Sequence, residues 1–191
     1  KTIIRGKFTY ADDKLIANTL TSAGTLSYDF LISLLKKESI EEILKSNEIV
    51  DFDLLKDALK DLNEKKSLVN IENAFDKYYY AHLMQFSQAL PRQGKLFREF
   101  LHKEVEVLNM LTLLRLKKAK FDKQLIKDFI IPSGNKIRDS KLMKLAEVDN
   151  LEEFPKTMEN TDYKDMLSKG IEEFKKSNSL IALETEFYKY L

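Results

Sequence analysis

The longest hydrophobic pattern in the chain runs from Phe97 to Lys120, with the sequence FREFLHKEVEVLNMLTLLRLKKAK. Apolar residues recur along it at intervals of three and four positions, which predicts one long α-helix. They form two stripes, the first with Phe97, Leu101, Leu108 and Leu111 and the second with Phe100, Val107, Met110 and Leu114. Because apolar side chains cover most of its circumference, we expect this helix to lie between neighbouring elements.

Three polar residues interrupt the apolar surface of this helix: Glu106, Asn109 and Arg115. Glu106 and Asn109 are three positions apart, so they share a face of the helix and can hydrogen-bond to each other. Arg115 lies one turn beyond Leu111, at the end of an apolar stripe. We expect all three side chains to be at least partly buried and hydrogen-bonded, since an apolar neighbourhood disfavours an unpaired polar group.

The rest of the chain also has helical spacing, and no segment shows convincing alternation of period two, so the predicted fold class is all-α. Capping residues mark several helix starts, and Gly24 is expected to end one helix in the left-handed conformation. Gly134, after Pro132 and Ser133, is expected to close another, and Pro155 to kink a short helix that begins at Asn150. The other predicted helices cover residues 1–6, 12–23, 28–37, 40–46, 51–65, 67–90, 122–131, 139–148, 161–176 and 179–190.

The two halves of the chain share an ordered series of identical residues. The offset between the halves is 110 residues at first and then becomes 111 and 112, as one residue is inserted twice. Among the identical pairs are Thr2/Thr112, Arg5/Arg115, Lys7/Lys117, Asp12/Asp122, Gly24/Gly134, Glu41/Glu152, Asp51/Asp162, Glu72/Glu184, Phe75/Phe187 and Tyr78/Tyr190. This order predicts an internal repeat of two similar helical modules, at residues 1–90 and 91–191.

The repeat also bears on how the chain begins. The first residue is Lys1 rather than methionine, and it falls where the second module has the last turns of its long helix. The first module has no counterpart of residues 97–110. We therefore expect the chain to be a fragment of a longer protein whose preceding part supplies that helix.

Composition narrows the function classes. A hydrophobic content of 43% with only five glycines and three prolines fits a folded helical protein. The net charge of +1, from 32 basic and 31 acidic residues, gives no electrostatic reason to expect nucleic acid as a partner. There is no cysteine, no signal peptide and no apolar run of about 18 residues that would predict a membrane span.

Candidate chemistry is sparse. The chain has no GxxxxGK[ST] or GxGxxG motif, so no phosphate-binding loop is predicted. His82 and His102 are too far apart for a local metal motif, and most carboxylates occupy caps or solvated faces, although a catalytic pair among them stays open. Tyr78, Tyr79 and Tyr80 point about 100° apart on a helix and do not form one stacking surface. The basic residues between Arg115 and Lys127 fit a solvated helix end, with contact to an anionic surface as the alternative. We predict no catalytic, cofactor or metal residue.

The segment Glu104–Lys117 resembles the signature helix of the C subunit of archaeal and bacterial A/V-type rotary ATPases, which is related to the d subunit of the eukaryotic V-ATPase. That family typically has an acidic residue, an asparagine three positions later, a lysine, and then Leu-Leu-Arg with a basic residue. Here Glu106 is the acid where aspartate is commoner, Asn109 and Arg115 match, and Leu111 replaces the lysine. Later segments that look like the family are IPSG at 131–134, TDY at 161–163 and LIALE at 180–184.

The resemblance implies an all-helical funnel of similar modules around a pseudo-threefold axis, of which this chain is a fragment. It implies a non-catalytic central-stalk subunit on the cytoplasmic face of the membrane, without a membrane span of its own. Its partners would be the central-stalk subunits and the membrane rotor ring, and its cofactors none. The motif residues, listed here, would then serve structure or interfaces: Arg5, Gly24, Glu106, Asn109, Arg115 and Gly134.

Another class of protein also fits an all-helical chain with a repeat. A helical-repeat scaffold binds partner proteins in a groove, but its period is usually about 33–47 residues, whereas the period here is about 110. A helical enzyme is a third alternative. A third copy of the Asn-to-Arg helix in the full-length sequence would favour the ATPase subunit over the scaffold.

Overall fold

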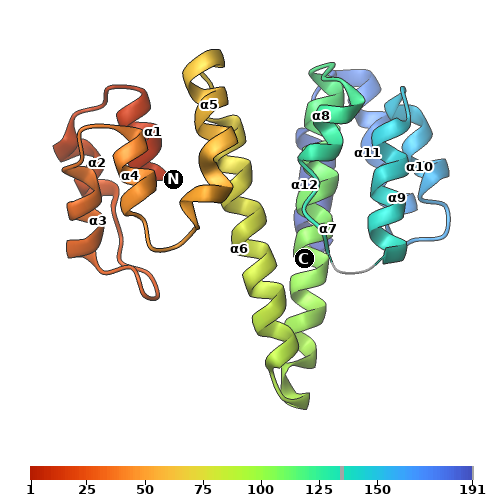
Figure 1. The fold of residues 1–191 in the computed structure, drawn as a ribbon. Helices are drawn as coiled ribbons and strands as arrows, with labels where there is room; N and C mark the ends of the chain where they lie inside the picture. Colours follow the sequence, from red (N-terminus) through yellow and green to blue (C-terminus); the bar gives the residue numbers. More distant parts are fainter. Residues whose placement is uncertain (134–135, 191) are drawn as a thin grey trace. The chain divides into compact units, whose positions relative to one another are not determined.

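The protein is all-helical in the computed structural model, which describes residues 1–133 and 136–190, without the side chains of residues 136–138 (Figure 1). Within these residues there is no β-strand; Ala23 and Leu26 form one isolated bridge. The chain divides into two compact units, Lys1–Tyr79 and the residues from Tyr80 onward, and each is described by itself. Nowhere in the described part is a helix both long and apolar enough to cross a bilayer.

The first unit is a chain of short helices that ends on the first half of a long one. Its elements are α1 (Thr2–Phe8), α2 (Asp13–Thr19), α3 (Tyr28–Leu35), α4 (Ile40–Ser46), the 3₁₀ turn η1 (Phe52–Leu55), α5 (Lys56–Lys65) and the start of α6 (Val69–Ala89). Their apolar faces form one core, which includes Ile3 and Ile4 of α1, Leu44 of α4, Leu55 of η1 and Ile71 of α6. The first and last elements of the unit therefore share a core.

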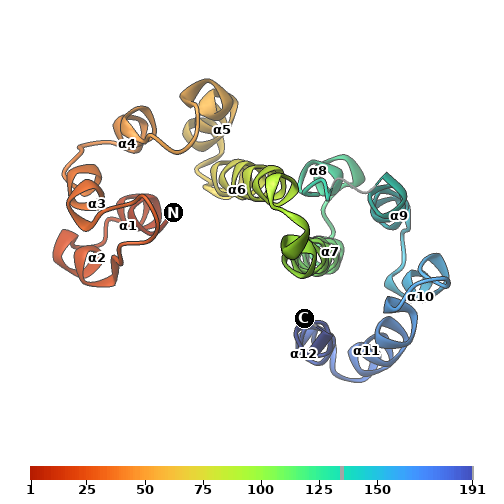
Figure 2. The ribbon, with the colours of Figure 1, turned by 90° about the horizontal axis from the view of Figure 1, so that it is seen from below.

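The second unit begins with the remainder of α6 and the longest helix. After the 3₁₀ turn η2 (Arg92–Gly94) come α7 (Lys95–Lys118), α8 (Lys123–Asp128), α9 (Lys136–Glu147), the 3₁₀ turn η3 (Leu151–Glu153), α10 (Phe154–Thr157), α11 (Tyr163–Ser177) and α12 (Ile181–Tyr190). Seen from below, α8 to α12 follow a curve that returns to α7 (Figure 2). The core lies inside this circuit, where α7 contributes Met110 and Leu114 and α12 contributes Leu183 and Phe187.

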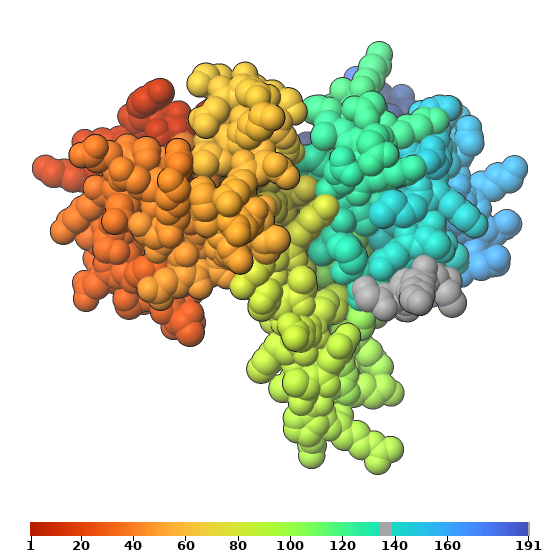
Figure 3. All heavy atoms as spheres, in the orientation of Figure 1, coloured from red at the N-terminus to blue at the C-terminus, as the bar shows by residue number. Residues whose placement is uncertain are grey.

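The end of α6 and the start of α7 form an antiparallel hairpin. Met84 of α6 packs with Leu101 and Val105 of α7 in a small core of their own. The Arg98 side chain donates to the backbone carbonyls of Ser87 and Leu90, at 3.0 and 3.1 Å, and so satisfies the end of α6. Figure 3 shows the tip of this hairpin, in yellow-green, projecting away from α8–α12 of the same unit.

The predicted helix starts are confirmed where a capping side chain accepts a backbone N–H. Asp12 caps α2, Ser27 caps α3, Ser39 caps α4, Asp122 caps α8 and Asn150 caps η3. Such caps satisfy N–H groups that have no partner inside the helix, which explains why these starts could be read from local sequence.

Two predicted features of the loops are wrong. The helix α2 ends at Thr19 because Leu20 is extended, so Gly24 does not close it. Gly24 has a left-handed φ of +58°, but in a turn closed by hydrogen bonds between Ala23 and Leu26. Pro155 does not kink a helix either, because η3 precedes it and the proline falls in the first turn of α10, where its missing N–H has no intrahelical partner to lose. The helix end predicted at Gly134 lies outside the described residues.

Candidate functional site

Asn109 is the most buried polar residue of α7, with 1% of its surface exposed. Its side-chain nitrogen donates to the carbonyl of Ile131 at 2.7 Å, and its oxygen accepts from the N–H of Ile131 at 2.8 Å. The amide therefore acts as a backbone partner for the segment that follows α8. The sequence predicted that this helix ends at Ile131, but α8 ends at Asp128. The N–H of Ile131 is bound by Asn109 and not by a helical carbonyl.

Glu106 is also buried, with 5% exposed, and the hydroxyl of Tyr163 donates to its Oε2 at 2.6 Å. Tyr163 begins α11, so the contact joins the middle of α7 to the far side of the unit. Both residues line a pocket of about 330 Å³, together with Met110 and Tyr190. Predicted burial and hydrogen bonding are thus confirmed for Glu106 and Asn109, through partners on other elements.

The rim of this pocket is aromatic and charged. The rings of Tyr163 and Tyr190 meet edge to face with centroids 5.2 Å apart, and the Tyr190 hydroxyl donates to Asp162 at 3.2 Å. Burial and the bond to Asp162 raise the pKa of Tyr190. The ammonium of Lys103 lies 4.8 Å from the centre of the Tyr190 ring, a cation–π distance. These contacts fix the end of α12 against α7.

Arg115 lies at the surface, with its side chain 51% exposed, so the expected burial is wrong, whereas the expected hydrogen bond is present. Its Nε donates to Oε1 of Glu184 at 2.8 Å, which joins the last turns of α7 to the first turn of α12. This hydrogen bond is the main reason that the pKa of Arg115 is raised. The pair closes the circuit of the second unit.

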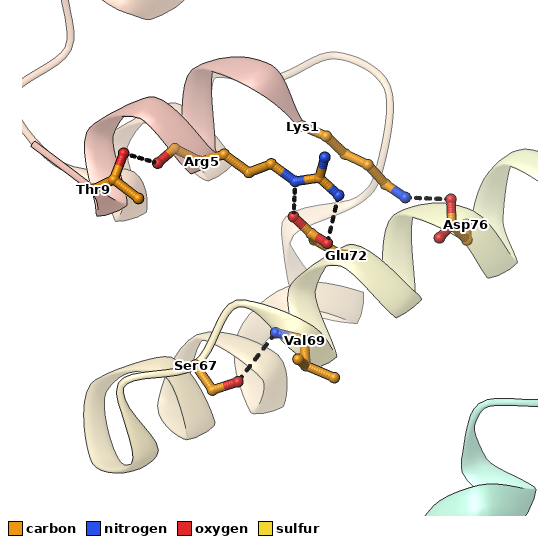
Figure 4. A network of polar contacts seen from close by, with 7 residues as sticks. All are labelled: Lys1, Arg5, Thr9, Ser67, Val69, Glu72 and Asp76. Carbon is orange, nitrogen blue, oxygen red and sulfur yellow. Dashed lines mark hydrogen bonds and ion pairs between the residues drawn. The ribbon is translucent and has the colours of Figure 1, made fainter. Parts of the chain in front are cut away.

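Arg5 makes the corresponding contact in the first unit (Figure 4). Its Nε and Nη2 both donate to the carboxylate of Glu72, the second at 2.8 Å, and Lys1 pairs with Asp76 one turn further along α6. The bond from Arg5 is the main cause of the lowered pKa of Glu72. Two-point contacts of this kind fix geometry as well as charge.

Several details recur in both units. Arg5–Glu72 joins α1 to α6, and Arg115–Glu184 joins α7 to α12. Both residues of each pair are among the identical residues that the two halves of the sequence share. Tyr10 and Lys120 follow their helices with φ of 57° and 59°. Lys66 and Asn178 both have φ of 51° and end α5 and α11. A left-handed non-glycine residue is uncommon, so four at matched positions are a specific correspondence.

Several basic residues after Arg115 make contacts within the second unit. The ammonium of Lys117 donates to the carbonyls of Ala146 and Val148 at the end of α9, and burial lowers its pKa. Lys123 pairs with Asp149, and Lys127 pairs with Glu147. These charges cap a helix end or form exposed ion pairs, as predicted for a solvated helix end, and contact with an anionic surface stays a prediction.

The arrangement offers little for catalysis. No three or more His, Cys, Asp or Glu side chains come together to hold a metal ion within the described part of the chain. The predicted carboxylate Glu106 accepts from a tyrosine of the same unit, and the predicted Arg5 and Arg115 donate to glutamates of their own units. Sequence reasoning did not single out Glu72, Glu184 or Tyr163 as partners, although the first two were among the repeated identities and the third was in the TDY segment.

Comparison with known proteins decides the family. The family model of the ATP synthase (C/AC39) subunit matches residues 1–191. The chain belongs to this family. The resemblance noted in the sequence is thereby confirmed.

The relatives that match are named as the C subunit of A-type ATP synthase. One from Methanococcoides burtonii is 36% identical over 97% of this chain and 50% of its own length. Others, from Methanosarcina acetivorans and Halobacterium salinarum, are 32% and 30% identical over 100% and 96% of this chain and 51% and 53% of their own lengths. The chain therefore spans about half the length of these relatives. No solved structure matches it.

Proposed function

We propose that the protein is a non-catalytic central-stalk subunit of a V/A-type rotary ATPase. In this role it couples the membrane rotor ring to the stalk and contributes to ATP synthesis or hydrolysis linked to ion movement. The observation that carries the proposal is the match of the whole chain, residues 1–191, to the ATP synthase (C/AC39) subunit family. Its place would be the cytoplasmic face of the membrane, as a peripheral subunit.

The contacts of the motif residues support a mechanical role. Asn109 and Glu106 hold other elements of the second unit against α7, and Arg5 and Arg115 each close a unit. A subunit that transmits torque has to resist deformation, and close-packed helices joined by such contacts do so. The lack of a phosphate-loop motif in the sequence is consistent with nucleotide chemistry elsewhere in the complex.

We also propose that the two units are copies of one module, with the boundary at the turn between α6 and α7, so that residues 1–90 and 91–191 correspond. The recurring Arg–Glu pairs and left-handed residues support this proposal. The units divide earlier, inside α6, because the second half of that helix packs on α7. A pseudo-threefold funnel in the longer relatives would follow from a third copy.

The test is assembly of the full-length natural protein. Immobilised protein, at low salt, should recover the central-stalk subunits and the rotor ring from detergent-solubilised membranes. Recovery should weaken as salt is raised if part of the contact is electrostatic, because salt screens exposed charges. Recovery of neither component would overturn the proposal in favour of a scaffold that binds other proteins.

Nucleotide binding gives a second test. Calorimetric titration of the protein with Mg-ATP should give no heat of binding, and the protein should not release phosphate from ATP. Binding in the micromolar range, or sustained hydrolysis, would contradict a non-catalytic role.

A further inference from the structure

A groove of about 490 Å³ lies in the first unit, where the end of α1 and the start of α4 meet α5. Its apolar lining includes Phe8 and Leu62, and Tyr10 stands at its rim with 95% of its surface exposed. Lys66, the left-handed residue that ends α5, forms another edge. The groove therefore combines apolar walls with the carbonyl end of a helix.

The corresponding place in the second unit is occupied by the chain itself. The ammonium of Lys118 donates to the carbonyl of Asn178 at 2.6 Å and lies 5.5 Å from the centre of the Phe174 ring. Lys175 and Glu152 form an ion pair at 3.0 Å between α11 and η3. Two lysines of the chain thus occupy this place in the second unit.

The first unit keeps the frame of this site and lacks both lysines. Lys66 has the backbone conformation of Asn178, and each donates its N–H to the carbonyl four residues earlier, Leu62 or Phe174. Glu41 stands at the position of Glu152. In the first unit, Phe8 stands at the position of Lys118, and Asn63 stands at the position of Lys175. Position 8 therefore has no donor that could reach the carbonyl of Lys66.

We propose that this groove binds a lysine or arginine side chain of a partner protein, in the place that Lys118 takes in the second unit. The aliphatic stem would lie on Leu62 and the cation at the carbonyl end of α5, where the helix dipole favours positive charge. The rings of Phe8 and Tyr10 attract a cation, and Glu41 supplies a carboxylate.

The charges around the groove permit this occupant. Lys7 is held by both oxygens of Asp13, at 3.0 and 3.1 Å. Glu41 pairs with Lys45 at 2.6 Å, but both side chains are about half exposed, so an incoming cation can compete for the carboxylate. Lys66 is exposed, and its flexible side chain can turn away from the site. The correspondence of the units identifies the occupant's chemistry, while the groove itself lies within the first unit.

The chemistry is tested with n-butylammonium, which has the stem and charge of a lysine side chain. Added to isotopically labelled protein, it should shift the backbone amide signals of residues 62–66 in a saturable way, with a dissociation constant on the order of millimolar for so small a ligand. The neutral n-pentanol, of similar size, should bind at least about fivefold more weakly. No shift at these residues, or equal shifts with both probes, would overturn the proposal.

Two substitutions should fill the groove of the first unit with a lysine of the chain itself. Phe8→Lys copies Lys118, and Asn63→Lys copies Lys175 opposite Glu41; both should abolish the n-butylammonium shifts. Because Phe8 packs partly against the core, Asn63→Lys, at an exposed position, keeps the test valid if Phe8→Lys fails to fold. Lys118→Phe should free the corresponding place in the second unit and create shifts at residues 174–178. Unchanged binding in Asn63→Lys would contradict the proposed site.

The source of the cation is tested in the assembled complex. A photo-crosslinking residue in place of Tyr10 should join to a partner segment that carries a lysine or arginine at the crosslink, and Asn63→Lys should remove this product. Three results would overturn a partner side chain as the occupant. They are a crosslink to a second copy of this chain, a crosslink to a segment without a cation, and the absence of any crosslink although free n-butylammonium binds. Loss of assembly itself would instead count against the proposed function.

Discussion

At the scale of single residues, the polar groups of α7 join segments that are distant in the chain. Asn109 holds Ile131, Glu106 holds Tyr163 and Arg115 holds Glu184, with sequence separations of 22, 57 and 69 residues. Each contact uses a different geometry, from a buried amide to a half-exposed ion pair. Buried members of this set are expected to matter more for stability, because removal of one partner leaves the other without a hydrogen bond.

Asn109→Ala should lower the free energy of unfolding by about 1–3 kcal/mol, because it leaves both backbone groups of Ile131 without their partner in a buried place. Chemical denaturation followed by circular dichroism measures the change. Asn18→Ala, at an exposed position of α2, is the control and should change stability by less than about 0.5 kcal/mol. Equal effects of the two substitutions would contradict the role given to Asn109.

The pair of Arg5 and Glu72 should make stability depend on pH. Because the folded-state pKa of Glu72 is lowered, chiefly by the bond from Arg5, the pair contributes stability above the ordinary glutamate pKa of about 4.3. That contribution is lost as pH falls through the lower folded-state value. Wild-type protein should therefore exceed Glu72→Gln in stability at pH 7, and the difference should shrink below about pH 4.

Urea unfolding of both proteins between pH 7 and pH 3 measures this difference. Glu64→Gln is the matched control, since Glu64 is 57% exposed and lies 4.0 Å from Lys60. Its difference from wild type should stay small across the range. A Glu72→Gln difference that is as large at pH 3 as at pH 7 would refute the linkage to ionisation.

At the scale of elements, short helices depend on their neighbours more than on their own propensity. The first unit contains seven-residue helices, such as α1 and α2, which would be marginal alone. They are held by caps and by close packing. At the crossing of α1 and α2, Gly6 leaves room for Ile16, because a Cβ at position 6 would lie 2.5 Å from Cγ1 of Ile16.

Gly6→Ala should therefore destabilise the first unit by about 1–3 kcal/mol through overpacking, although alanine is the better helix former. The measurement is a double-mutant cycle in denaturant. In the Ile16→Ala background the clash is gone, and Gly6→Ala should be neutral or stabilising. If Gly6→Ala cost the same in both backgrounds, contact with Ile16 would not be its cause.

At the scale of the whole molecule, the two units end on matching contacts. An arginine and a glutamate join α1 to α6 in the first unit and α7 to α12 in the second. Asp12 caps α2 through the N–H two residues on, and Asp122 caps α8 through the N–H three residues on. This correspondence suits a protein built by duplication, as in a subunit assembled from similar modules.

Residues 2–78 should superpose on residues 112–190 with only two single-residue insertions. The expectation rests on the identical residues and on the paired left-handed residues. A left-handed residue at the same position of both segments indicates that the chain turns in the same way there. Superposition of Cα positions from a crystal structure measures it. Arg5 and Arg115 at the ends of unrelated helices would contradict a duplicated module.

The sequence by itself determined the helical class, most helix starts and the family. These depend on spacing and on side chains that act within a few residues, such as Ser39 on the N–H of Glu42. The long helix could also be read from the period of its apolar residues, while the internal repeat stays a prediction. The end of α2 was mispredicted, because Gly24 has the left-handed conformation without ending a helix, and local propensity alone does not separate these cases.

Only the tertiary structure decided what each polar residue contacts. Asn109 and Glu106 share a face of α7, which made a mutual hydrogen bond reasonable, yet folding brings Ile131 and Tyr163 to them. Arg115 lies at the surface, where it pairs with Glu184 of α12. Whether a groove is open or filled was equally beyond local sequence, since it depends on which residue of α1 or α7 reaches the end of α5 or α11. Burial and partnership are set by packing between distant segments, and hydrophobic periodicity specifies a face but not its neighbour.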